Sequence, residues 1–337
     1  MAEIVLGIAT SHGPMLSTPV DQWWQRAEAD RTGRTDLWFQ GKQYQYADLV
    51  EARAGENLKK QITPEMMQAR HAACQQGIAA LAETFERVAP DVAVIIGDDQ
   101  EELFLDDNMP AFSVYWGDKV DNRAPSPEES AKMPPGIAVA NWGHFPPEPT
   151  VNPCEPGLAL HMINTFMNDS FDVAHSKRLP AGRHKTHSIP HAYGFVYRRI
   201  MKDEVVPNVP VFINTFYPPN QPTLRRCYDF GASILKAIES WDTDKKVAVI
   251  ASGGLTHFVV EEDLDQQVIE AMKAKDVNTL TNLPQERFNA GTSEIRNWIA
   301  TAAVMNGTKL EMEVLDYVPC YRSEAGTGNA MCFAQWM

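Results

Sequence analysis

The sequence contains no apolar run that approaches the roughly 20 residues needed to cross a bilayer. It also lacks the basic start and long apolar core of a secretion signal, so a cytoplasmic location without a membrane partner is expected. Positive charge is scarce too: 44 Asp and Glu outnumber 30 Lys and Arg, which makes the formal net charge −14. Because binding to nucleic-acid phosphates requires a basic surface, we expect no nucleic-acid partner.

Cysteine and the common phosphate-binding motifs are equally scarce. The five cysteines form no Cys-x-x-Cys pair, which argues against a zinc–thiolate site and against a disulfide framework. No phosphate loop, dinucleotide fingerprint or Gly-x-Ser-x-Gly nucleophile motif is present. Histidine and carboxylate side chains therefore remain as the main carriers of chemistry.

Segments with the pattern of strands alternate with segments of helical pattern. Short apolar runs bounded by glycine, proline or polar residues predict buried strands, the first of them over residues 4–8. Further strands are expected over 91–97, 109–115, 171–175, 209–215, 246–251 and 310–318. Helices are expected over 157–167, 195–201, 223–240, 264–275 and 293–305. A long helix is expected to begin at Thr63 and Pro64. This alternation predicts an α/β fold with a central, largely parallel or mixed sheet flanked by helices.

Two segments depart from this alternation. The chain is long enough to bury a sizeable core, and we expect a single domain over residues 1–337. Residues 20–60 are rich in tryptophan and charge with a weak helical pattern, which predicts a helical insertion after the first strand. Residues 118–153 are rich in proline and charge, which is typical of an irregular, lid-like excursion that lines a site.

Polar clusters follow several of the predicted strands. The first strand ends at Thr10-Ser11-His12-Gly13-Pro14, and ligands of open α/β sheets bind at the carboxyl ends of strands. Similar clusters contain Gln100, His191 and His257, the last followed by Glu261, Glu262 and Asp263. Any single histidine here could be a structural loop residue. Together, imidazole and carboxylate groups without thiolates suit Fe(II) or Mn(II) with open positions, so metal-assisted chemistry on a small molecule is expected.

Several motifs carry a family resemblance in their order and spacing. They are Ser11-His12-Gly13-Pro14, Gly97-Asp98-Asp99-Gln100, Asn214-Thr215-Phe216-Tyr217-Pro218-Pro219, Ser252-Gly253-Gly254-Leu255-Thr256-His257 and the segment from Gly291-Thr292-Ser293-Glu294 to Trp298. The chain resembles the class III extradiol ring-cleaving dioxygenases, the family that includes the protocatechuate 4,5-dioxygenase catalytic subunit and gallate dioxygenase. The resemblance implies a homodimer that opens the ring of a carboxylated catechol next to the diol, using O2. Substrates such as 3-O-methylgallate, gallate or protocatechuate, and a role in lignin-type aromatic catabolism, would follow.

The resemblance also implies a non-haem Fe(II) held by two histidines and one glutamate. His12 matches the first ligand. Gln100 stands where the second histidine usually lies, with His144 as the leading substitute and Glu101 behind it. Glu262 matches the carboxylate ligand, and a one-residue shift would select Asp263 instead.

Other residues receive roles from the same resemblance. His191 matches the acid/base histidine that handles the proton of the substrate hydroxyl, and His257 matches a motif histidine near the site. The candidates for gripping the substrate carboxylate are Thr292, Ser293, Thr327 and Asn329, with Gly291 beside them. Two alternatives stay open. One is a metal-dependent enzyme of the same fold with a different reaction, such as an aminophenol dioxygenase or a hydrolase, and the other is a non-catalytic member that has lost iron.

Overall fold

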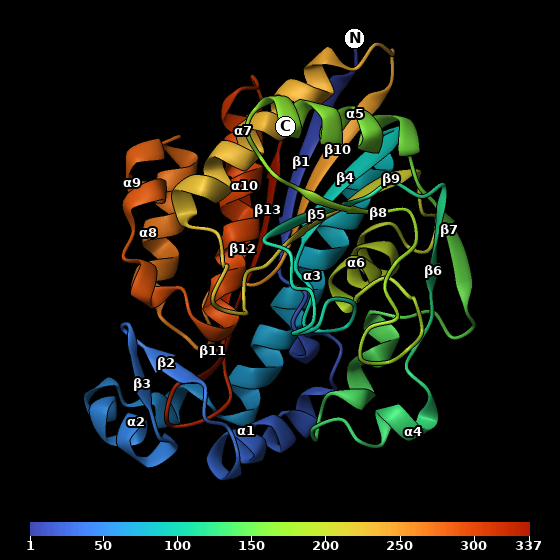
Figure 1. The fold of residues 1–337 in the computed structure, drawn as a ribbon. Coiled ribbons are helices and arrows are strands. Elements are labelled where there is room, and N and C mark those ends of the chain that lie inside the picture. Colours follow the sequence, from blue (N-terminus) through green and yellow to red (C-terminus); the bar gives the residue numbers. More distant parts are fainter.

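A nine-stranded mixed sheet runs through the middle of the computed structural model, which describes residues 1–337 (Figure 1). The strand order is β11-β13-β1-β10-β4-β9-β5-β8, and β12 pairs with β13. The strands are β1 (Glu3–Thr10), β4 (Val92–Gly97), β5 (Phe112–Tyr115), β8 (Ala174–Ser176), β9 (Asn208–Ile213), β10 (Lys246–Ser252), β11 (His257–Val259), β12 (Met312–Tyr321) and β13 (Thr327–Trp336). The neighbours β1, β10, β4 and β9 are parallel, whereas β13 and β5 are antiparallel to β1 and β9. The predicted mixed α/β sheet is confirmed.

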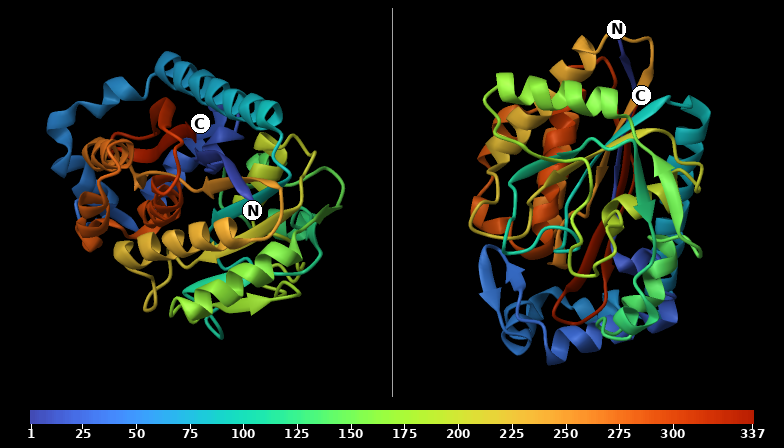
Figure 2. Two further views of the ribbon diagram at one scale, coloured as in Figure 1. Left: turned by 90° about the horizontal axis from the view of Figure 1, so that it is seen from above. Right: turned by 45° about the vertical axis from the view of Figure 1, so that its right-hand side comes forward.

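Helices cover both faces of this sheet, as Figure 2 shows in the view from above. On one face lies α3 (Pro64–Val88), which contacts β1, β12 and β13. On the other face α5 (Pro156–Asn168), α7 (Leu224–Ser240) and α10 (Ile295–Asn306) pack together. Further helices are α6 (His191–Phe195), α8 (Glu262–Lys273) and α9 (Val277–Asn282). None of the helices is both long and apolar enough to cross a membrane.

The central strands face two hydrophobic cores, one on each side of the sheet. In β4, Val94 and Ile96 belong to the core beneath α5, α7 and α10, whereas Ala93 and Ile95 belong to the core beneath α3. A strand that is buried on both faces reads as an unbroken apolar run, since no position faces water. This explains why the parallel strands could be located from the sequence.

The start of α3 follows the chemistry that its sequence predicts. Thr63 is the N-cap: its hydroxyl accepts a hydrogen bond from the backbone N–H of Met66 at 3.3 Å. Pro64 occupies the first helical position, where its missing N–H group costs nothing. The expected helix beginning at these residues is therefore confirmed.

The two additional segments are more ordered than the sequence suggests. Residues 20–60 contain α1 (Trp23–Thr32) and α2 (Tyr46–Ala52), but also a hairpin of β2 (Leu37–Phe39) and β3 (Lys42–Tyr44) that the sequence did not predict. In Figure 1 they lie at the lower end of the sheet. Residues 118–153 contain an antiparallel pair, β6 (Lys119–Asn122) and β7 (Thr150–Pro153), with the short helix α4 (Pro127–Ser130) between them.

One central strand was not predicted at all. The expected last strand over 310–318 corresponds to β12, but the chain then turns back and forms β13 between β11 and β1. All ten residues of β13 are buried, so the segment shows no alternation of polar and apolar residues. It also contains Gly328 and Asn329, which are rare in strands.

Candidate metal centre and adjoining cavity

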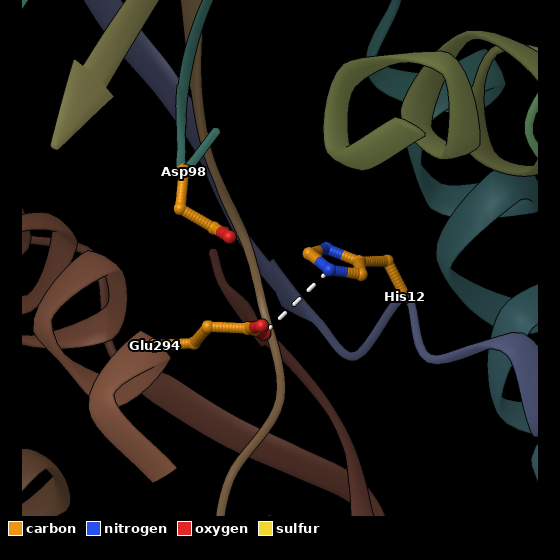
Figure 3. A group of neighbouring side chains, drawn as sticks. All are labelled: His12, Asp98 and Glu294. Atoms are coloured by element: carbon orange, nitrogen blue, oxygen red, sulfur yellow. Dashed lines mark ion pairs between the residues drawn. The ribbon is translucent and has the colours of Figure 1, made fainter. Parts of the chain in front are cut away.

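Three buried side chains converge at one edge of the sheet: His12, Asp98 and Glu294 (Figure 3). His12 follows β1, Asp98 follows β4, and Glu294 lies on the short turn before α10. Because β1 and β4 both flank β10 and run parallel to it, their carboxyl ends meet at the same edge. One ligand atom of each residue lies within 4.8 Å of the others. The sequence-predicted position of His12 at a strand end is thus part of a three-residue cluster.

The hydrogen bonds of His12 determine which of its ring nitrogens carries a proton. The hydroxyl of Ser252 donates to the backbone oxygen of Ala192 at 2.6 Å, so it accepts from Nδ1 of His12, 3.0 Å away. Burial lowers the pKa of His12 to about 3, so Nε2 carries no second proton. The lone pair of Nε2 then faces Oε2 of Glu294 at 3.5 Å. Two acceptors in this position repel each other, and a bound cation would relieve that repulsion.

Glu294 is the central acceptor of the cluster. Its Oε2 accepts a hydrogen bond from the backbone N–H of Gly254 at 2.8 Å, and its Oε1 lies 3.3 Å from Nε2 of His257. Burial by itself would raise the pKa of Glu294, but the adjacent imidazole of His257 is the largest of the influences that lower it to about 2. Glu294 is therefore an anion, and it is held in a site from which water is largely excluded.

Asp98 and Gln100 complete this edge of the site. Gln100 donates from its amide nitrogen to Oδ2 of Asp98 at 3.1 Å and to Oε1 of Glu294 at 3.3 Å. Asn297 donates to the other oxygen of Asp98 at 3.2 Å. Burial, together with the neighbouring Glu294, raises the pKa of Asp98 well above its ordinary value. Gln100 thus lies beside the cluster, and its role as a metal ligand stays a prediction.

The structure does not bring the predicted carboxylate ligand to His12. Glu262 is exposed at the start of α8, where its Oε1 accepts a hydrogen bond from the hydroxyl of Tyr321 at 2.7 Å. The alternative, Asp263, pairs with Arg287 at 3.0 Å. After His257 the chain passes through β11 and leaves the strand ends. The carboxylate beside His12 is instead Glu294, which belongs to one of the motifs that carry the family resemblance.

Two further histidines, His191 and His144, lie next to the cluster. The ring of His191 meets that of His12 edge-on, with centroids 4.8 Å apart. Its Nδ1 lies 2.5 Å from Oε2 of Glu102. Burial would lower the pKa of His191, but Glu102 raises it to about 9. His144 packs against His191, with ring centroids 5.6 Å apart, and is not one of the three converging residues.

A cavity of about 380 Å³ adjoins the cluster, a volume that suits a small molecule with a single ring. His12, Gln100, His191, His257 and Glu294 all line it. Both additional segments contribute to its walls. Residues 20–60 supply Arg26 and Arg34, and residues 118–153 supply apolar or polar groups at Pro125, Met133, Pro134, Ile137, Asn141, His144 and Phe145.

The predicted carboxylate-binding residues separate into different positions. Asn329 lines the cavity, and its Oδ1 accepts a hydrogen bond from Arg322 at 3.0 Å. Thr292 exchanges hydrogen bonds of 3.1 and 3.0 Å with the backbone of His257, so it holds that histidine in place. The hydroxyl of Thr327 pairs with that of Ser323, and the buried hydroxyl of Ser293 has no partner. Of these four residues, Asn329 alone is part of the cavity lining.

Comparison with known proteins identifies the family of this chain. Residues 61–327 match the family described as the catalytic LigB subunit of aromatic ring-opening dioxygenase, so the chain belongs to this family. A gallate dioxygenase from Pseudomonas putida is 32% identical over 165 residues, which cover 45% of this chain and 44% of that protein. A 2,3-dihydroxyphenylpropionate/2,3-dihydroxicinnamic acid 1,2-dioxygenase from Comamonas testosteroni is 24% identical over 187 residues, or 55% and 49% of the two chains. The chain thus spans about half the length of the curated relatives that it matches.

Proposed function

We propose that this protein is a metal-dependent dioxygenase that opens the ring of a carboxylated catechol, such as 3-O-methylgallate, gallate or protocatechuate, with O2. One observation carries the proposal: the unprotonated Nε2 of His12 faces the carboxylate of Glu294 at the wall of a cavity sized for one ring. Family membership supports the reaction class.

The residues present fit an Fe(II) ion. Nε2 of His12 and a carboxylate oxygen of Glu294 would hold it, and Asp98 is the third residue whose ligand atom converges there. An imidazole and carboxylates without a thiolate are donors that suit Fe(II) and leave positions open. When bound, the iron would bring the catechol oxygens and O2 together in one coordination sphere and provide a path for electrons between them.

His191 is proposed to hold and move the proton of the substrate hydroxyl. Glu102 occupies its Nδ1, so Nε2 is the ring nitrogen left to exchange a proton with the substrate. Because Glu102 stabilises the imidazolium, His191 would hold the proton that it takes from the substrate hydroxyl and return it to an oxygen of the opening ring. His257 is a second candidate for this role, since it lines the same cavity and its Nε2 lies 3.3 Å from Glu294.

The two additional segments are proposed to enclose the substrate within one catalytic domain over residues 1–337. Residues 118–153 would act as the lid, because seven of the cavity-lining residues come from this segment. Shielding the ring from water would strengthen every polar contact inside the cavity. From the resemblance we further propose a cytoplasmic homodimer in lignin-type aromatic catabolism.

A non-catalytic family member is the second candidate function. The observation that favours it is Gln100, whose amide nitrogen donates to both Asp98 and Glu294 and partly satisfies these carboxylates without a metal. An amide oxygen is also a weaker donor to Fe(II) than imidazole. A protein that does not retain iron would follow from this arrangement.

The test is anaerobic reconstitution with Fe(II), followed by measurement of bound iron and of O2 uptake with protocatechuate, gallate, 3-O-methylgallate and 2-aminophenol. We expect stoichiometric iron and O2 uptake with at least one of the three carboxylated catechols. Uptake with 2-aminophenol alone would indicate the aminophenol reaction, and iron without any uptake would indicate a different reaction. Failure to bind iron would support the non-catalytic alternative.

A further inference from the structure

Arg26, on α1, is a buried arginine of the cavity wall that has no carboxylate partner. Its exposed fraction is 4%. Its single hydrogen bond runs from Nη1 to the backbone oxygen of Pro135 at 3.3 Å, and it forms no ion pair. A buried guanidinium without a counter-charge is costly, because it has lost water and gained no anion in return. The protein therefore supplies no carboxylate as a counter-charge for the guanidinium of Arg26.

The neighbouring carboxylates are already occupied. Asp30 accepts a hydrogen bond from Arg322 at 2.7 Å and forms an ion pair with Arg34 at 3.2 Å, and Asp36 pairs with Arg34 at 3.2 Å. Three guanidinium groups thus share two carboxylates, which leaves one positive charge in excess. The neighbouring positive charges affect Arg26: burial, together with Arg322 and Arg34, lowers its pKa to about 9.

The position of Arg26 directs this charge into the cavity. Arg26 lines the same 380 Å³ space as His12 and Glu294, whereas Asp30 and Asp36 do not. Its side chain is held against Gly136, where an added Cβ would lie 2.9 Å from Cδ of Arg26. The lid segment therefore fixes the side chain in position at two neighbouring residues, Pro135 and Gly136.

We infer that Arg26 is the residue that binds the carboxylate of the aromatic substrate, an inference that rests on the proposed function. The substrate anion supplies the counter-charge that α1 and the lid leave out. The planar guanidinium can grip a carboxylate through two parallel hydrogen bonds, which also orients the ring. With the carboxylate held at Arg26, the diol is the part of the substrate that remains to approach His12 and Glu294. A neutral catechol would leave Arg26 buried and unpaired.

The test compares a carboxylate with its neutral counterpart in equilibrium binding and needs no iron. Protocatechuate and its methyl ester are titrated calorimetrically into the metal-free protein, the Arg26→Met variant and the Arg26→Lys variant. Arg26→Met should weaken protocatechuate binding by about 10- to 100-fold, the usual contribution of a charge-assisted contact, and leave binding of the ester unchanged. Arg26→Lys should lie between the parent and Arg26→Met, because it keeps the charge and loses the paired hydrogen bonds.

Arg31→Gln is the matched control. Arg31 lies on the same helix but is exposed and pairs with Glu324 at 2.9 Å, so its loss should leave both affinities unchanged. Thermal unfolding of each variant checks that the fold is kept, and Arg26→Lys provides a second variant if Arg26→Met unfolds. Equal affinity of the parent protein for acid and ester, or an equal loss of both in Arg26→Met, would overturn the inference. Selective binding without ring opening would instead reject the proposed function and leave the role of Arg26 intact.

Discussion

The cavity has two charged regions, one around His12 and one around Arg26, and their charges are unbalanced in opposite ways. Around His12, the strand ends bring together acceptors, with Nε2 of the imidazole facing a carboxylate at 3.5 Å and no proton between them. Around Arg26, residues of the insertion and Arg322, which follows β12, bring together three guanidinium groups and two carboxylates. In the first region an unprotonated ring nitrogen faces a carboxylate, and in the second the guanidinium groups outnumber the carboxylates. Under the proposed function, an aromatic acid bound beside a metal ion would compensate both, and one cavity would select its ligand at two places.

The largest effect should come from removing the acceptor charge at the strand ends. Glu294→Gln should weaken metal binding by more than about 100-fold and abolish turnover, since even residues behind the ligands contribute 10- to 100-fold. Metal content after dialysis measures this. Glu262→Gln is the control, because Glu262 is exposed and bonded to Tyr321, and it should keep the metal. Loss of metal in Glu262→Gln, with retention in Glu294→Gln, would restore the assignment made from the sequence.

The next largest effect should separate proton transfer from metal binding. His191→Phe should lower kcat by about 10²- to 10⁴-fold, the usual contribution of a positioned acid or base, while bound iron stays close to stoichiometric. His187→Ala serves as the comparison, since Nδ1 of His187 bonds to the backbone of Leu179 outside the cavity lining. If the iron disappears together with the activity, His191 is a ligand. Parallel data on His257→Phe would show which of the two histidines moves the proton.

A smaller effect is expected at Gln100, on the border of the metal cluster. Gln100→Leu removes the amide that donates to Asp98 and Glu294 and should weaken iron binding by about 10-fold. Gln100→His should retain or strengthen iron binding, because imidazole is the better donor to Fe(II). Titration of the two variants and the parent protein with Fe(II) measures these changes in affinity. Parental iron affinity and ring-opening activity in Gln100→Leu would exclude this residue from the metal site.

The last expected effect concerns stability and pH in the metal-free protein. The pKa of His191 is raised from 6.5 to about 9, so its pairing with Glu102 stabilises the fold fully below about pH 6.5 and is lost as the pH rises through about 9. The free energy of unfolding should fall by about 1–3 kcal/mol across this window, allowing for partial solvent screening. Denaturant titrations at several pH values should show that His191→Phe lacks this decrease. If the free energy of unfolding of His191→Phe falls with pH as much as that of the parent, other groups cause the decrease.

Much of the α/β fold was predictable from the sequence, because the central strands and their flanking helices have strong hydrophobic patterns. The strand before His12 and the one before Asp98 are apolar runs that end in polar residues, so both could be placed at the same edge of the sheet. Glu294 was harder to assign, because an acidic residue after His257 satisfies the spacing equally well. The turn before α10 carries Glu294 to His12 only through tertiary packing.

Arg26 illustrates a different limit of the sequence. Nothing in the weak helical pattern of residues 20–60 distinguishes Arg26 from Arg31 or Arg34. The difference arises because Asp30 and Asp36 pair with other arginines and because Arg26 contacts Pro135 of the segment 118–153. Charge balance of this kind depends on which residues meet in space. β13 could not be predicted for a related reason, because a completely buried strand shows no alternation of polar and apolar residues.

The placement of Arg26 on a different segment from the three converging residues has an evolutionary consequence. Arg26, the proposed carboxylate-binding residue, lies on α1 within residues 20–60, whereas His12, Asp98 and Glu294 lie after β1, after β4 and before α10. If Arg26 binds the substrate carboxylate, selection can alter residues 20–60 and change which aromatic acid is accepted, while the strand ends remain as they are. A lineage that meets a new carbon source would then need to change one inserted segment and could inherit the rest of the enzyme unaltered.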